Sequence, residues 1–169
     1  MLVRNRSLLK KIAKKCNQNS KSKTCKYALG FTEAELKIER LIKRLPASRV
    51  QRGERNRIFV VAGAFDVDRG RGTVAFNGTP VRVSPQLVQH ARKFLGLSIG
   101  DRHACGNTVG RCAEWRSANN LLQSGSRIKN IRWTLAYFVD EDEMNPGRVE
   151  RGTIAPYCAI CQNAFGLEN

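Results

Sequence analysis

The chain has 169 residues, of which 41% are hydrophobic, and it carries a formal net charge of +16. This length favours one domain with a hydrophobic core of its own, so a bound metal would serve chemistry more than folding. No apolar run approaches the roughly 18 residues of a membrane-spanning helix, which excludes such a helix. The N-terminus has no sustained apolar segment, so no cleavable secretory signal is visible.

The positive charge is concentrated near the N-terminus. Residues 1–30 contain nine lysine and arginine residues and no acidic residue, whereas residues 31–169 contain 21 basic and 14 acidic residues. We therefore divide the chain into a basic N-terminal arm, 1–30, and a domain, 31–169. Such an arm is typical of nucleic-acid binding, and binding to an acidic protein or solubility alone are the alternatives.

Two helices are predicted in the first third of the chain. Leucine and isoleucine at helical spacing indicate a short basic helix over 8–15, followed by a polar loop over 17–23. The sequence of residues 32–35, Thr-Glu-Ala-Glu, forms a capping box, which predicts that a second helix begins at Thr32. Pro46 is expected to end that helix.

A β-hairpin is predicted next. The nearly continuous apolar run over 58–67 is typical of a strand that is buried on both faces. A turn over 68–72 rich in glycine and arginine leads into a second strand over 73–76, and residues 77–80 form another turn.

The second half of the chain alternates helices with a strand. A helix is expected over 85–95, a glycine-containing loop over 98–111, and a helix from Cys112 that stops at Gly125. A strand over 131–139, an acidic turn over 140–143 and a last helix that starts at the second cysteine motif complete the order. This order predicts an α/β fold, with helices that cover a small mixed sheet.

Two short cysteine motifs carry the functional signal. They are Cys112-Ala113-Glu114 and, near the C-terminus, Pro156-Tyr157-Cys158-Ala159-Ile160-Cys161. Both stand at predicted helix starts, where the positive end of the helix favours the thiolates that a metal requires. Cys158 and Cys161 are three residues apart and so share one helix face. Three thiolates on a zinc ion would leave its fourth position open, as in catalytic zinc sites.

These motifs resemble the signature of zinc-dependent nucleobase deaminases in the variant with three cysteines. Over residues 110–122 and 156–166, the chain is similar to the cytidine deaminase-like superfamily, and within it to the toxin deaminases of bacterial polymorphic toxins, notably the YwqJ-like and related groups. The likeness covers about residues 55–169 and implies a three-layer α/β/α sandwich. Members usually place one or two strands after the last helix, so we expect either a minimal version without them or an N-terminal segment that replaces them.

The resemblance also implies a mechanism. Zn²⁺ is bound by Cys112, Cys158 and Cys161, and Glu114 transfers protons from water to the ring and the leaving amine. The implied substrate is cytosine in nucleic acid, unpaired or flipped out, with cytosine favoured over adenine on the resemblance alone. We expect a toxin domain that acts in the cytoplasm of a target cell after delivery in a larger secreted protein, and an acidic immunity protein is a candidate partner.

Six residues are candidate contacts to the substrate. The family often holds substrate at the position that Asn77 occupies, and Asn107 in the glycine loop is the alternative to it. The arginines beside the first motif could meet a phosphate, and the two aromatic residues could pack against a base, with core packing as the alternative. The candidates are Asn77, Asn107, Arg111, Trp115, Arg116 and Tyr157.

Other functions and other uses of the cysteines remain open at this point. A deaminase of free nucleosides or another small amine is the second function, although a small neutral nucleoside gains little from a charge of +16. The third is a basic nucleic-acid-binding module, in which Cys105 closes a structural zinc site of four cysteines, and His103 could also become a ligand. Disulfides are not expected among the six cysteines, because a basic intracellular enzyme has no oxidising compartment to maintain them. Cys16 and Cys25 lie in the polar, basic arm and are expected to be bystanders.

Overall fold

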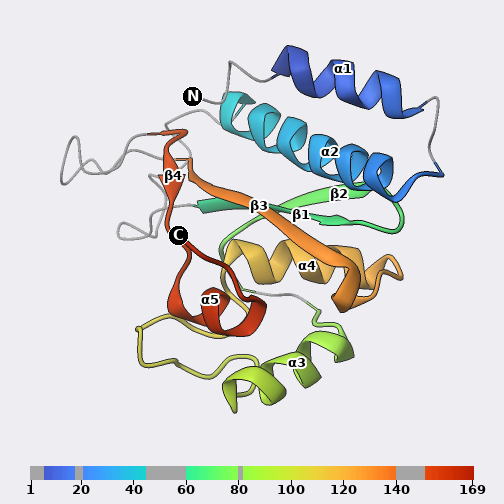
Figure 1. Ribbon diagram of the computed structural model, residues 1–169. Helices are drawn as coiled ribbons and strands as arrows, with labels where there is room; N and C mark the ends of the chain where they lie inside the picture. The colour runs from blue at the N-terminus through green and yellow to red at the C-terminus, as the bar shows by residue number, and fades with distance from the viewer. Residues whose placement is uncertain (1–5, 18–20, 45–59, 80–81, 140–150) are drawn as a thin grey trace.

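The structure is a computed structural model that describes residues 6–17, 21–44, 60–79, 82–139 and 151–169. It shows a mixed α/β protein in which an antiparallel sheet is covered by helices on both faces (Figure 1). The expected strand residues 58–59, the acidic turn over 140–143 and the predicted helix end at Pro46 lie outside the described residues. Within the described ranges, no helix has the length and apolar character needed to span a membrane.

The sheet has four strands in the order β2-β1-β3-β4. β1 (Val60–Asp66) and β2 (Arg71–Phe76) form the predicted hairpin, β3 (Ile131–Phe138) pairs with the other edge of β1, and the short β4 (Ile154–Ala155) pairs with β3. All three pairings are antiparallel, so the prediction of a mixed sheet is wrong. β3 does run in the same direction as β2, but it lies beside β1, and hydrophobic periodicity does not reveal which strands become neighbours.

Helix α2 (Lys23–Arg44) crosses one face of the sheet, and α1 (Arg6–Asn17) packs on its outer side (Figure 1). The helix start predicted at Thr32 is wrong, because α2 already begins at Lys23 and continues through residue 30, where we divided the arm from the domain. Thr32 is 3% exposed inside the helix. Gly30 does not break α2 because its missing side chain allows the helix to approach the sheet: a Cβ there would lie 3.1 Å from the Cβ of Phe65.

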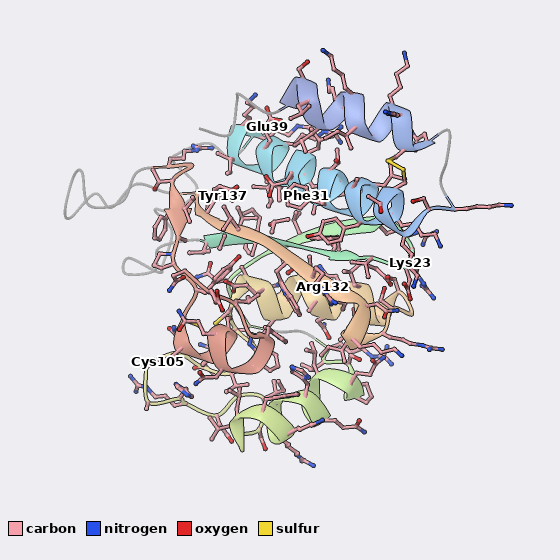
Figure 2. The ribbon with its side chains drawn as sticks, in the orientation of Figure 1. Lys23, Phe31, Glu39, Cys105, Arg132 and Tyr137 are labelled. Carbon is pink, nitrogen blue, oxygen red and sulfur yellow. A yellow bond between two sulfur atoms is a disulfide. The ribbon has the colours of Figure 1, made fainter. Side chains whose placement is uncertain are left out.

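Cys16 and Cys25 form a disulfide, visible as the yellow bond between α1 and α2 in Figure 2. The expectation that both cysteines are bystanders is therefore wrong. Cys16 is in the last turn of α1 and Cys25 in the first turn of α2, so the antiparallel arrangement of these helices brings the two side chains together. The disulfide fixes α1 on the outside of α2.

The outer edge of β2 is protected by side chains from both helix layers. The backbone N–H of Gly72 donates to the Glu33 carboxylate at 2.8 Å, and Lys37 donates to the Gly72 carbonyl at 2.6 Å. From the opposite face, the Arg116 guanidinium donates to the carbonyl of Phe76 at 2.7 Å. Backbone groups at a sheet edge that are satisfied in this way are poor templates for pairing with another chain.

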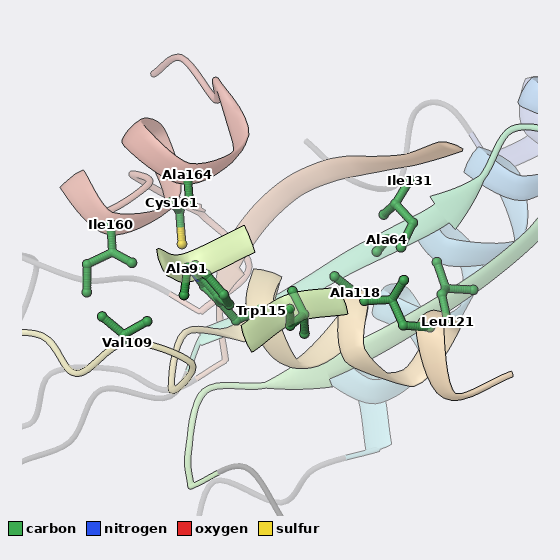
Figure 3. Close-up of a cluster of buried hydrophobic side chains, with 12 residues drawn as sticks. Ala64, Ala91, Val109, Trp115, Ala118, Leu121, Ile131, Ile160, Cys161 and Ala164 are labelled. Carbon is green, nitrogen blue, oxygen red and sulfur yellow. The ribbon is translucent and has the colours of Figure 1, made fainter. Parts of the chain in front are cut away.

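Helix α4 (Ala113–Gln123) crosses the other face of the sheet, and α3 (Pro85–Leu95) lies on the side of α4 away from the sheet (Figure 1). Helix α5 (Ala159–Phe165) lies beside α4, packs on α3, and stacks the ring of Phe165 on that of Trp133 in β3. A short 3-10 helix, η3 (Ile128–Asn130), precedes β3. These elements enclose the largest core cluster (Figure 3). Its buried members are Ala64, Leu87, Ala91, Val109, Trp115, Ala118, Leu121, Leu122, Ile131, Ile160, Cys161 and Ala164.

Glu35 is a buried carboxyl group on the face of α2 that covers the sheet, and burial raises its pKa from 4.5 to about 7, partly opposed by a hydrogen bond with Tyr137. The folded protein therefore binds this proton more tightly than the unfolded chain does. The contribution of Glu35 to the free energy of unfolding is complete below about pH 4.5 and is lost as the pH rises through about 7. We predict that Glu35→Gln removes this loss and raises the free energy of unfolding at pH 8 by up to about 3 kcal/mol relative to wild type.

Urea unfolding at pH 5 and pH 8 measures this effect. The matched control is Glu168→Gln, which changes an exposed carboxyl and should leave the wild-type pH dependence intact. If Glu35→Gln and wild type lose the same stability between the two pH values, the assignment to Glu35 is wrong.

Candidate metal centre

Two helix starts carry the cysteine motifs, as the sequence predicts. Cys112 is the N-cap of α4 and Cys158 is the N-cap of α5, and both have extended backbone conformations. Cys161 follows in the first turn of α5, where its N–H donates to the carbonyl of Cys158 at 2.9 Å. The packing of α4 and α5 on the same side of the sheet thus brings together thiols that are far apart in the sequence.

The three sulfur atoms form a compact cluster. The Sγ atoms of Cys112 and Cys158 are 3.2 Å apart, those of Cys158 and Cys161 are 3.6 Å apart, and all three lie within 4.8 Å of one another. These cysteines are close enough to bind one metal ion. Within the described residues, Cys105 is exposed and is not a member of this group.

The three thiols are unequal. Hydrogen bonds with Cys112 and Cys161 lower the pKa of Cys158, so Cys158 is the first of the three to become a thiolate. The hydrogen bond with Cys158 raises the pKa of Cys112 against an opposing bond with Cys161, and hydrogen bonds with Cys112 and Cys158 raise the pKa of Cys161. Binding of a cation would remove this difference, because it favours the thiolate form of all three cysteines and releases their protons.

Glu114 places a carboxylate beside the sulfur atoms. Its side chain is 4% exposed, and its Oε2 lies 3.4 Å from the Sγ of Cys161. Burial and, to a smaller extent, the charge of the nearby Cys158 raise the pKa of Glu114 to about 7, and hydrogen bonds with its own backbone and with Cys161 partly oppose this rise. A carboxyl group with this pKa can both accept and donate a proton near neutral pH.

Two hydrogen bonds to the backbone carbonyl of Glu114 stabilise the first turn of α4. The indole Nε1 of Trp133 donates to the Glu114 carbonyl at 3.1 Å, and the Ser117 hydroxyl donates to the same carbonyl at 3.0 Å. Trp133 was not among the candidates from the sequence. It belongs to β3, and only the tertiary packing of β3 on α4 brings it here, so no local motif could identify it.

Three of the candidate substrate residues lie where β2 ends beside α4. The Gly78 N–H donates to the carbonyl of Arg111 at 2.8 Å, which connects the residue after Asn77 to the residue before Cys112. The Asn77 carboxamide oxygen accepts a hydrogen bond from the N–H of Val60 at 2.9 Å. Arg116 donates to the end of β2, so part of its guanidinium is used inside the protein.

The two aromatic candidates are placed differently. Trp115 is 1% exposed and packs in the core with its ring 4.8 Å from that of Phe165, so it presents no open face to a base. Tyr157 is half-buried next to Cys158, and its hydroxyl donates to the Thr134 carbonyl at 2.8 Å. Tyr157 is therefore adjacent to the cluster, although its hydroxyl is used to bind β3.

The remaining candidates belong to the loop before α4. Asn107 is exposed, and its carbonyl accepts a hydrogen bond from the N–H of His103 at 2.9 Å. The Nδ1 atom of His103 accepts a hydrogen bond from the N–H of Cys105 at 3.2 Å, and His103 is not in the group that could hold a metal. The loop is closed by a bridge between Arg102 and Thr108.

Comparison with protein-family models, with curated proteins and with solved structures finds no match for this chain. Functional conclusions therefore depend on the arrangement of the three cysteines and Glu114 and on the motifs in which they stand.

Proposed function

We propose that this protein is a zinc-dependent hydrolytic deaminase that converts cytosine to uracil in nucleic acid. The observation that carries the proposal is the position of a buried carboxylate, that of Glu114, 3.4 Å from one sulfur of a cluster of three cysteines. A structural zinc site needs four protein ligands and no buried acid beside it, whereas a catalytic site keeps three ligands and a position for water.

Zinc is the metal that fits this site best. Thiolates are soft ligands that favour zinc over hard cations such as magnesium and calcium, and Cys112, Cys158 and Cys161 would supply three of them. When bound, zinc would supply the acidity that turns water into a nucleophile near neutral pH.

Glu114 would act in proton transfer. It accepts the proton of the attacking water and returns protons to the ring nitrogen and to the departing amine, so that cytosine and water give uracil and ammonia. Its position 3.4 Å from the Sγ of Cys161 suits transfer of protons at the metal site, and its burial keeps bulk water from competing for them.

Asn77 and Arg111 are the substrate contacts that the geometry favours. The hydrogen bond between Gly78 and Arg111 keeps the end of β2 beside Cys112, so a substrate bound at the cysteines would lie near both segments. Arg111 is half-buried and could still offer its charge to a phosphate. Asn107 and Tyr157 would contribute at the periphery, whereas the buried Trp115 and Arg116, which is bonded to the end of β2, would stabilise the segments around the site.

The fold supports this proposal without being specific for it. A sheet covered by α2 on one face and by α4 on the other agrees with the three-layer arrangement of the cytidine deaminase-like superfamily. The roles as toxin domain, the action in the cytoplasm of a target cell and the acidic immunity partner are parts of the proposal that rest on the likeness of the motifs.

The test is incubation of the zinc-loaded protein with DNA and RNA oligonucleotides of mixed sequence and, separately, with free cytidine. We expect uracil in single-stranded oligonucleotides, read by sequencing, and slow or no conversion of cytidine. Efficient conversion of cytidine with none in oligonucleotides would instead make the protein a small-molecule deaminase, and no conversion of either substrate would exclude the deaminase function.

A further inference from the structure

Helix α1 lies on the side of the sheet opposite to the cysteine cluster. α2 covers one face, α1 packs on the outside of α2, and the cysteines stand at the starts of α4 and α5 on the other face (Figure 1). A ligand that contacts both α1 and the cluster must therefore pass around the edge of the sheet.

The two sides of α1 differ in chemistry. Its inner side packs on α2 through residues at the spacing of one helix face, and these residues are partly or fully buried: Leu9, Ile12, Ala13 and Cys16. The disulfide from Cys16 to Cys25 fixes this side in place.

The outer side of α1 is a surface of exposed lysines, which we call the lysine face: Lys10, Lys11, Lys14 and Lys15. No acidic residue occurs before Glu33, so α1 itself carries no counter-charge. Two pairs of these lysines are four residues apart, which is about 6 Å along a helix, close to the roughly 6.8 Å that two stacked nucleotides occupy.

We propose that the lysine face binds the phosphate backbone of a polynucleotide at a distance from the cysteine cluster and tethers the enzyme to its substrate. The proposal rests on the proposed function in taking this polynucleotide to be the substrate. A protein partner fits the face less well, because protein interfaces need a buried apolar centre and Leu8 is the one large apolar residue of α1 that is more than half exposed.

The separation of the two surfaces predicts a dependence on length. A domain of this size is roughly 40 Å across, and a path around half of its circumference is roughly 60 Å, so a stacked strand that passes around the edge of the sheet needs about 18 nucleotides to reach from one surface to the other. A shorter oligonucleotide can occupy only one surface at a time. A longer oligonucleotide that is bound at one surface reaches the other without dissociating, and this second, intramolecular contact raises its affinity for the protein.

The test compares the affinities of a 6-nucleotide and a 40-nucleotide single strand, measured by fluorescence anisotropy over a range of salt concentrations. Wild type should bind the 40-mer at least about tenfold more tightly than the 6-mer. A variant with all four lysines of the lysine face changed to glutamine should lose this difference, and its log–log salt slope for the 40-mer should be smaller by about 0.7 for each lost contact.

The matched control removes four exposed charges elsewhere, on α3 and around η3: Arg92→Gln, Lys93→Gln, Arg127→Gln and Lys129→Gln. It should keep most of the preference for the 40-mer. Equal losses in the two variants would mean that net charge alone is responsible, and an equal affinity of wild type for both lengths would also overturn the proposal. Circular dichroism of both variants checks that α1 and the remaining helices are retained.

The binding assay involves no turnover, so its outcome is separate from that of the deaminase test. A length-dependent affinity that requires the lysine face, without uracil formation, would refute the deaminase and retain a polynucleotide surface. Uracil formation without a length-dependent affinity would support the deaminase and refute the lysine face as a polynucleotide surface.

Discussion

Glu114→Ala is expected to reduce deamination by about 10²- to 10⁴-fold while the protein keeps its fold and its metal. The carboxylate is 4% exposed and lies beside Cys161, so it can transfer protons at the metal site without being one of the three sulfur ligands. Loss of the buried acid also removes an unfavourable desolvation, which should offset part of the cost of the cavity that alanine leaves. Uracil formation, metal analysis and circular dichroism on one preparation measure the three properties together.

Glu114→Gln is the matched variant, because it fills the same space and removes only the ability to transfer a proton. We expect the same loss of activity from glutamine as from alanine. If either variant deaminates at nearly the wild-type rate, Glu114 is not the proton carrier. If both lose the metal, Glu114 is a ligand and the mechanism is different.

The parts of the fold that the sequence predicted are those determined locally. The β1–β2 hairpin, α3 and the two cysteine-capped helix starts follow from short patterns of apolar residues, turns and caps, and the structure confirms them. The start of α2 could not be predicted, because a capping box at Thr32 is outweighed when the preceding turn, including Gly30, packs against the sheet. Tertiary contacts of this kind override local propensity.

Contacts between residues that are distant in the sequence could not be predicted either. Cys16 and Cys25 are separated by a polar segment, and their disulfide depends on the antiparallel packing of α1 on α2. The same holds for the candidate site. The motifs predicted the cluster of Cys112, Cys158 and Cys161, but the contact of Trp133 with the Glu114 carbonyl depends on the packing of β3 on α4.

Replacement of Cys158 and Cys161 together by serine is expected to remove the bound metal completely. Wild type should contain about one zinc ion per chain when freshly purified, because three thiolates within 4.8 Å of one another form a preorganised site. Serine hydroxyls stay protonated near neutral pH and are hard ligands, so the remaining thiolate of Cys112 cannot hold zinc alone. Elemental analysis of the two proteins after identical purification measures the difference.

Cys105→Ser is the control that separates the catalytic from the structural interpretation. Cys105 is exposed and outside the cluster, so this variant should keep its zinc and its activity. Loss of zinc from Cys105→Ser would mean that four cysteines close the site, which would leave no position for water and no role for Glu114. Full zinc content in the Cys158→Ser, Cys161→Ser double variant would show that the metal is bound elsewhere.

The affinity of the wild-type protein for zinc should fall as the pH is lowered, because zinc must displace protons from these thiols. A titration with a competing chelator at pH 6 and pH 8 measures this dependence.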